Sequence, residues 1–268
     1  MEIGTILAAL GLTLVAGLST GVGSLLAFFA KAGNTKFLSC ALGLSAGVMV
    51  YVSFMDLLPD SIETLCEMYG GKSAQIYALI AFFVGIGVIA LIDFMIPEDE
   101  NPHEMHSYDE LNDHTSHNHH VKRAGVMVAL AIGIHNFPEG IATFVSALDG
   151  IEVALPIVIA IAIHNIPEGM AVSVPIYYAT GSKVKALRYS FLTGLAEPIG
   201  AAVGALILLP FWNPVIGALL LAFVAGIMVY ISFDELLPGA EQYGHHHMSI
   251  IGVVAGMAIM AGGLLLFK

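Results

Sequence analysis

The chain has 268 residues, of which 57% are hydrophobic and only 11% are charged, and its mean hydropathy is +0.86. Soluble domains carry about 25% charged residues, so this composition excludes a cytosolic enzyme and indicates an integral membrane protein. The formal net charge of −12 also argues against nucleic acid as a partner.

Eight apolar segments are long enough to cross a bilayer, which takes about 20 helical residues. Turn-forming Gly, Pro, Asn and Asp residues separate them, and Pro59 and Pro238 are two such predicted breaks. The sequence therefore predicts an all-α membrane protein with one transmembrane domain, residues 1–268. In chain order the expected helices lie near residues 4–30, 36–58, 74–96, 124–146, 153–177, 186–209, 215–237 and 248–267.

Basic residues predict the orientation of these helices. Seven Lys and Arg residues fall on the side of the loops that follow the first, third and fifth helices, against two on the opposite side. Because cytoplasmic loops carry an excess of basic residues, both termini are expected outside the cytoplasm. Residues 97–123 then form a long cytoplasmic loop. Its polar composition fits either loop metal binding or a solvated linker, and the candidate metal ligands are His103, His106, His114, His117, His119 and His120.

Part of the second helix recurs in the seventh. Residues 50–59 read Val-Tyr-Val-Ser-Phe-Met-Asp-Leu-Leu-Pro, and residues 229–238 read Val-Tyr-Ile-Ser-Phe-Asp-Glu-Leu-Leu-Pro. The first and sixth helices match more weakly. Five spans separate the partners, so matched helices cross the membrane in opposite directions. The pattern predicts an inverted repeat of three, two and three helices, which is typical of secondary transporters.

The fourth and fifth helices carry nearly the same hexapeptide. Residues 135–140 read His-Asn-Phe-Pro-Glu-Gly, and residues 164–169 read His-Asn-Ile-Pro-Glu-Gly. Each hexapeptide begins about eleven residues into its predicted helix, which places it near the middle of the bilayer. Two antiparallel copies at one depth argue for a shared site rather than for two structural histidines.

Helical geometry predicts how each hexapeptide could bind metal. At about 100° per residue, Glu139 lies between His135 and Asn136 around the helix, and Glu168 lies between His164 and Asn165. Each carboxylate could therefore share one cation with the histidine and another with the asparagine. The spacing favours a site that holds two adjacent cations.

Prolines are expected to break these helices at the same depth. Pro138 and Pro167 each remove an amide and clash with the carbonyl four residues back, which is tolerated in a membrane only beside a cavity or protein. Glu197-Pro198 in the sixth helix repeats the arrangement. In the weak alignment of the first and sixth helices, Glu197 falls opposite Thr20, so the expected site is not symmetric.

Electrostatics favour a cation at this position. A charge at the bilayer centre costs roughly 2.5–3.5 kcal/mol, so three glutamates cost on the order of 8–10 kcal/mol. No Lys or Arg lies at that depth in any predicted helix, so the carboxylates must be protonated or balanced by a cation. Imidazole and carboxylate without thiolate suit zinc, and also iron(II), manganese, cobalt or cadmium. Proton exchange is a natural companion of metal binding.

These motifs, the eight helices and the His-rich loop resemble the ZIP (Zrt-, Irt-like) family of metal transporters, and the paired hexapeptides are similar to its bacterial ZupT-type branch. The resemblance implies uptake of divalent metal across the bacterial inner membrane, with metal as substrate, no organic cofactor and a possible homodimer. It implies a first metal position at His135, Glu139, His164 and Glu168, and a second at Asn136, Glu139, Asn165, Glu168 and Glu197.

Four further acidic residues are candidate steps on a metal pathway. By analogy with the family, Asp93, Asp234 and Glu235 would line the cytoplasmic exit, and Asp56 could gather metal at the outer entrance. The alternative interpretation is that they are interfacial carboxylates solvated by lipid headgroups.

Two other functions were weighed against uptake. A metal-dependent intramembrane hydrolase would also place His and carboxylate around zinc, but the chain has no His-Glu-x-x-His motif, so no enzyme activity is expected. A metal exporter stays open, because a sequence predicts topology without the direction of net flux.

Overall fold

The computed structural model describes residues 3–29, 35–95, 133–134, 136–148 and 150–267. Helices and short turns account for these residues, and no strand occurs among them, so the all-α prediction is confirmed for the described chain. The helices are α1 (Ile3–Phe29), α2 (Thr35–Val52), α3 (Leu58–Tyr69), α4 (Gly71–Met95), residues 136–148, α6 (Ile151–Thr180), α7 (Lys183–Gly194), α8 (Ala196–Leu208), α9 (Pro214–Ile231), α10 (Leu237–Gln242) and α11 (His246–Phe267), with the shorter η1 (Ser53–Leu57), η4 (Leu209–Phe211) and η5 (Ser232–Leu236) between them.

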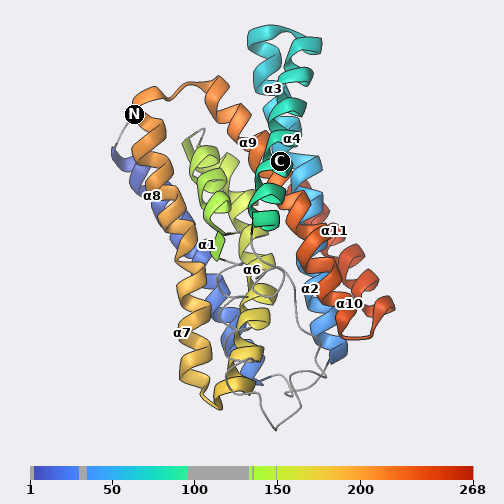
Figure 1. The fold of residues 1–268 in the computed structure, drawn as a ribbon. Coiled ribbons are helices and arrows are strands. Elements are labelled where there is room, and N and C mark those ends of the chain that lie inside the picture. Colours follow the sequence, from blue (N-terminus) through green and yellow to red (C-terminus); the bar gives the residue numbers. More distant parts are fainter. Residues whose placement is uncertain (1–2, 30–34, 96–132, 135, 149, 268) are drawn as a thin grey trace.

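Seven helical stretches within the described ranges are long and apolar enough to cross a membrane. The expected helix near residues 124–146 and the loop at 97–123 lie partly or wholly outside the described residues. The long helices run alternately in opposite directions, and α1 begins and α11 ends towards the end of the bundle where α3 meets α4 (Figure 1). The turn between α6 and α7 lies at the other end.

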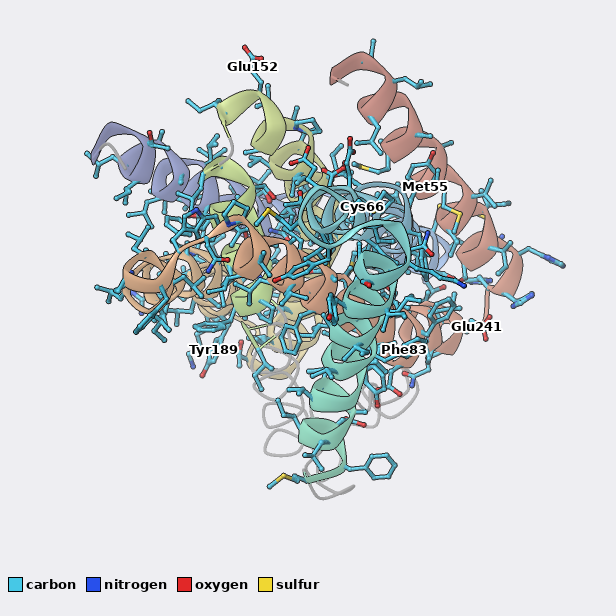
Figure 2. All side chains as sticks on the ribbon, turned by 90° about the horizontal axis from the view of Figure 1, so that it is seen from above. Met55, Cys66, Phe83, Glu152, Tyr189 and Glu241 are labelled. Atoms are coloured by element: carbon cyan, nitrogen blue, oxygen red, sulfur yellow. The ribbon has the colours of Figure 1, made fainter. Side chains whose placement is uncertain are left out.

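The helices form two groups that meet at α2 and α6. The first helix group comprises α1, residues 136–148, α6, α7 and α8, and the second comprises α2, α3, α4, α9, α10 and α11. Glu152 and Tyr189 mark the first group and Met55, Phe83 and Glu241 mark the second in the view from above (Figure 2). The described candidate site residues lie in the first group.

Glycines set the close packing inside the first group. A Cβ at Gly17 would lie 2.2 Å from the carbonyl oxygen of Gly194, and one at Gly194 would lie 2.0 Å from that of Gly17. Small residues let helix backbones approach closely in membranes. This reciprocal contact joins α1 to the end of α7, which are the helices that the weak repeat matches.

The second group has the same kind of contact at matched positions. A Cβ at Gly47 on α2 would lie 2.1 Å from the carbonyl oxygen of Val253 on α11, and one at Gly226 on α9 would lie 2.0 Å from that of Phe82 on α4. Gly47 and Gly226 occupy equivalent places just before the matched segments 50–59 and 229–238. The pair α2 and α11 therefore packs as the pair α9 and α4 does.

The predicted break at Pro59 is wrong, because the chain stays helical from Thr35 to Tyr69. Pro59 offers no amide to the carbonyl four residues back, and the helix adapts by widening into the π-helical turn η1. The Leu58 amide donates to the Ser53 carbonyl, and the Ser53 hydroxyl donates to the Met49 carbonyl at 2.8 Å. Such π-turns are frequent at functional sites.

The predicted break at Pro238 is wrong for the same reason. The Leu237 amide donates to the Ser232 carbonyl, and the Ser232 hydroxyl donates to the Met228 carbonyl at 2.7 Å. The two matched segments therefore share a π-turn, η1 and η5, and not only a sequence. In both of them the helix continues past the proline.

Proline affects α6 and the α7–α8 junction differently. The expected break at Pro167 is not seen, because α6 is one helix from Ile151 to Thr180. A single missing amide leaves one carbonyl without its regular donor, and packing against α1 holds the helix together. Pro198 does accompany a break, since α7 ends at Gly194 and α8 begins at Ala196. The Gly194 carbonyl, which a regular helix would pair with residue 198, instead lies against Gly17.

Candidate metal site

Six of the seven predicted ligands are described, and all six are buried in the first helix group. Asn136 and Glu139 come from residues 136–148, and Glu197 comes from the first turn of α8. The seventh, His135, lies outside the described residues. The exposed fractions of the described side chains are Asn136 0%, Glu139 1%, His164 0%, Asn165 0%, Glu168 0% and Glu197 0%.

Side-chain contacts join the two hexapeptides. The His164 Nε2 lies 3.0 Å from the Glu139 Oε1, which links α6 to the 136–148 helix. The ring nitrogen is the donor of this contact when Glu139 is ionised. The histidine of one motif thus meets the glutamate of the other, as a cation shared between the two helices would require.

The asparagines are oriented by backbone carbonyls of the first group. Asn165 Nδ2 donates to the Ala16 carbonyl at 3.1 Å and to the Glu197 Oε1. Asn136 Nδ2 donates to the Thr193 carbonyl at 3.4 Å. Ala16 precedes Gly17 and Thr193 precedes Gly194, so the two asparagines use equivalent places in α1 and α7. Each amide nitrogen is thereby held on the scaffold, which leaves the amide oxygen for a ligand.

Several oxygen atoms of the site have no hydrogen-bond partner among the described residues. They are Asn136 Oδ1, Asn165 Oδ1 and Glu197 Oε2. Buried polar atoms are nearly always satisfied in proteins, so such oxygens mark a place for a ligand. Oxygen atoms of amides and carboxylates accept cations, and none of these three can serve as a donor while Glu197 is ionised.

The glycine that ends each hexapeptide fixes the acid that lies beside it. A Cβ at Gly140 would lie 1.9 Å from the Glu197 carbonyl oxygen, and one at Gly169 would lie 1.8 Å from the Thr20 carbonyl oxygen. Glu197 is therefore held against the first motif and Thr20 against the second. Glu197 and Thr20, which differ in the weak alignment, thus make the equivalent contact with the final glycine of a hexapeptide, Glu197 with Gly140 and Thr20 with Gly169.

The buried carboxylates of this region lie apart from the described Lys and Arg residues. Glu139, Glu168 and Glu197 are fully buried, whereas every described Lys and Arg is exposed, namely Lys36, Lys72, Lys183, Lys185 and Arg188. Within the described residues no three His, Cys, Asp or Glu side chains are placed to hold a metal together.

The four pathway candidates fall into two kinds. Asp56 and Glu235 are 0% and 1% exposed, and they occupy equivalent positions in η1 and η5. Asp234 is exposed and Asp93 is half-buried, and the Tyr230 hydroxyl donates to Asp93 Oδ2 at 3.3 Å. The π-turns therefore turn one carboxylate of each matched segment inward. The six loop histidines lie outside the described residues.

Sequence reasoning missed Ser45, which touches the site from the second helix group. Its hydroxyl donates to Glu168 Oε1 at 3.0 Å, and Ser45 is fully buried on α2. The two residues are 123 positions apart in the chain. The available signal was the repeat around residue 45, where the matched position in α9 is the apolar Val224.

The family model and the curated relatives that match this chain are all described as zinc transporters. The family model described as ZIP Zinc transporter matches residues 95–263. The chain is 56% identical over 272 residues to the zinc transporter ZupT of Nitratidesulfovibrio vulgaris, with 98% of each chain covered. It is 54% identical over 275 residues to the zinc transporter ZupT of Clostridium perfringens, covering 98% of this chain and 96% of the relative. The ZupT of Streptococcus mutans is 56% identical over 256 residues, with 96% of each chain covered.

Proposed function

The chain belongs to the family of ZIP zinc transporters, and from this premise we propose that it carries divalent metal into the cytoplasm. It is a multi-pass membrane protein and not an enzyme, because its family and relatives are transporters. The hydrolase hypothesis is therefore set aside. Zinc is the substrate of first choice, since the matched relatives are named zinc transporters.

The observation that carries the proposal is the buried charge. Three carboxylates lie in the membrane-spanning first group, and the described Lys and Arg residues are all at the surface. An ion in this environment costs several kcal/mol unless it is compensated. A dication that enters and leaves supplies that compensation transiently, as transport requires.

We assign the metal to two adjacent positions. The first uses His135, Glu139, His164 and Glu168, and the second uses Asn136, Glu139, Asn165, Glu168 and Glu197. Support comes from the 3.0 Å contact of His164 with Glu139 and from the contact of Asn165 with Glu197. The acceptor oxygens of Asn136 and Asn165 without described partners favour the second position.

The donor types bear on metal selectivity. Imidazole, carboxylate and amide groups without thiolate accept zinc, iron(II), manganese, cobalt and cadmium. We propose that the protein transports several of these ions, with zinc preferred because two histidines are available.

The proposed architecture has eight helices, an inverted repeat and both termini outside the cytoplasm. The shared π-turns and the matched glycine contacts support the repeat. In such transporters the repeats exchange roles when the site opens to the other side. Here the first helix group would move against the second.

Metal would reach the site past Asp56 and leave it past Glu235, Asp234 and Asp93. The burial of Asp56 and Glu235 at equivalent positions supports placing one on each side of the midplane. The loop histidines would bind metal in the cytoplasm, and a homodimer in the bilayer is a further proposal. Sedimentation of the purified protein in detergent tests the dimer.

Uptake into liposomes tests the function directly. Purified protein is reconstituted and given radioactive zinc, iron(II) or manganese outside, with and without a pH gradient. The amount of metal inside the liposomes should exceed that in protein-free liposomes, and the excess should be largest for zinc. If protons exchange with metal, an opposing pH gradient should alter the rate of uptake. Efflux from preloaded vesicles without uptake would instead identify an exporter, and absence of metal movement in either direction would reject transport.

A further inference from the structure

The repeated segments differ at one position that faces the site. Residues 45–49 read Ser-Ala-Gly-Val-Met and residues 224–228 read Val-Ala-Gly-Ile-Met, directly before the matched segments already described. Ser45 and Val224 are thus equivalent, and their side chains are 0% and 1% exposed. The hydroxymethyl side chain of serine is smaller than the isopropyl side chain of valine, and only the hydroxyl can donate a hydrogen bond.

On the side of α2, Ser45 is the residue through which the second helix group contacts the proposed metal site. Its hydroxyl donates to Glu168 Oε1 at 3.0 Å, and α2 packs directly against α6. This contact crosses the boundary between the two helix groups. A buried acceptor that loses its hydrogen bond is costly, so the contact favours the arrangement in which α6 lies on α2.

On the side of α9, a cavity replaces that contact. Val224 lines a cavity of about 740 Å³ together with Phe137, Pro138 and Ile141, which flank Glu139 in the first hexapeptide. Tyr189 of α7 and Ile89 of α4 also line it, so the cavity lies between the first group and the helices α4 and α9. Helix α6 therefore contacts α2 directly, whereas a cavity lies between the 136–148 helix and Val224 of α9.

We propose that Ser45 is a positioning residue that holds the first helix group on α2 through Glu168 and so favours this conformation. The proposal rests on the alternating transport described above. In the opposite conformation the repeats exchange roles, and the 136–148 helix packs on α9. Glu139 then meets Val224, which gives no hydrogen bond, so that conformation is less populated in the absence of metal.

The same contact explains how metal would release the first group. A cation bound to Glu168 withdraws charge from its oxygens, which weakens the hydrogen bond from Ser45. The preference for the α2-docked conformation falls, and the loaded site can move. Ser45 therefore acts through Glu168, and the metal ligands remain those proposed above.

Spin-label distances test the conformational preference without requiring transport. Cys40 and Cys66 are replaced by alanine, and labels are placed at residues 37 on α2 and 184 on α7, both of which are exposed. Pulsed EPR is recorded in nanodiscs with EDTA. The parent should show one dominant distance, and Ser45→Ala should raise the minor population about tenfold, as leaving a buried acceptor without its hydrogen bond implies. A label pair at residues 25 and 184, within the first group, should not change.

Reciprocal variants separate this role from a general packing defect. Val224→Ser supplies a donor to Glu139 in the opposite conformation, so it should shift the populations in the same direction as Ser45→Ala. The exchange Ser45→Val with Val224→Ser should invert the ratio, and Ser45→Thr should restore the parent ratio in part. Val48→Ser is a second change of a buried valine to serine, on α2 instead of α9, and it should leave the ratio of the two populations unchanged.

Two results would overturn the proposal. The first is an unchanged ratio in both Ser45→Ala and Val224→Ser, and if Ser45→Ala does not fold, Val224→Ser decides alone. The second is a ratio that Val48→Ser shifts as strongly as Val224→Ser. Uptake by the parent with no shift in these variants rejects the role of Ser45 and leaves the transport function, whereas a shift without uptake by the parent rejects the transport function.

Discussion

The site contains carboxylates whose neighbours come from other helices. Glu139 lies against His164, Glu197 against Asn165, and Glu168 against Ser45. Removing a buried charge changes a site of this kind more than removing an exposed one, because solvent cannot replace the lost interaction. The individual side chains can therefore be tested with isosteric changes.

Glu168→Gln should reduce zinc uptake in liposomes by more than about tenfold, because the change removes a charge and a proposed bridging ligand. Glu139→Gln should act in the same way. Glu152→Gln is the matched control, since Glu152 lies on the same helix as Glu168 but is exposed, and its uptake should equal that of the parent. Full transport by both buried variants, with normal membrane insertion, would reject the bridging role.

His164→Ala should change metal preference more than protein yield. Imidazole favours zinc over manganese, whereas oxygen donors accept both, so the ratio of zinc to manganese uptake should fall about tenfold. His247→Ala, at an exposed position at the start of α11, should leave the ratio unaltered. An unchanged ratio in His164→Ala would count against this residue as a ligand.

At the scale of the helix, packing depends on glycines and on the two π-turns. The glycines of the hexapeptides bring α1 and α8 to the site, and the π-turns rotate Asp56 and Glu235 inward. At both kinds of position the geometry of the helix backbone determines which side chains are buried beside the proposed metal site or its pathway.

Gly169→Ala should destabilise the protein, because the new methyl group would lie 1.8 Å from the Thr20 carbonyl oxygen. Overpacking of this kind costs about 1–3 kcal/mol, and the thermal unfolding midpoint in detergent should fall. Gly87→Ala on α4 is the matched control, because nothing lies within 4 Å of an added Cβ there. Its midpoint should stay the same or rise slightly, owing to the better helix propensity of alanine. Equal midpoints for the two variants would contradict the close approach at Gly169.

At the scale of the whole molecule, the two helix groups carry different tasks. The first holds the proposed ligands, and the second provides the surface against which they are placed. The loop at 97–123 joins α4 of the second group to the helix that carries the first hexapeptide, and it contributes none of the proposed midplane ligands.

Deleting residues 103–120 should therefore preserve zinc transport, because the proposed path runs through the helices. The maximal rate of uptake into liposomes should stay within about twofold of the parent rate, which corresponds to a change of less than about 0.4 kcal/mol in the activation barrier. Replacing the six loop histidines with serine, at unchanged loop length, is the companion variant. Loss of flux in both variants would place the loop on the path.

Local sequence patterns were sufficient for the class of protein and for nominating the site. Apolar length and low charge predict membrane helices wherever they occur, and the hexapeptides place His, Asn and Glu on one helix face by spacing alone. The assignment of these residues to metal positions stays a prediction. Proline was less informative, since Pro59 and Pro167 were expected to end or break helices that continue.

The sequence by itself determined that this chain is an all-α membrane protein and that each hexapeptide carries histidine and carboxylate at a spacing that places them on one helix face, because both properties depend on composition and on spacing within one helix. The tertiary structure decided which groups meet: Glu168 with Ser45, Glu139 with His164, and a cavity beside Val224. It also decided that Glu235 is buried while its neighbour Asp234 is exposed. Such pairings depend on how helices far apart in the chain approach and rotate, and no periodicity within a single helix encodes that.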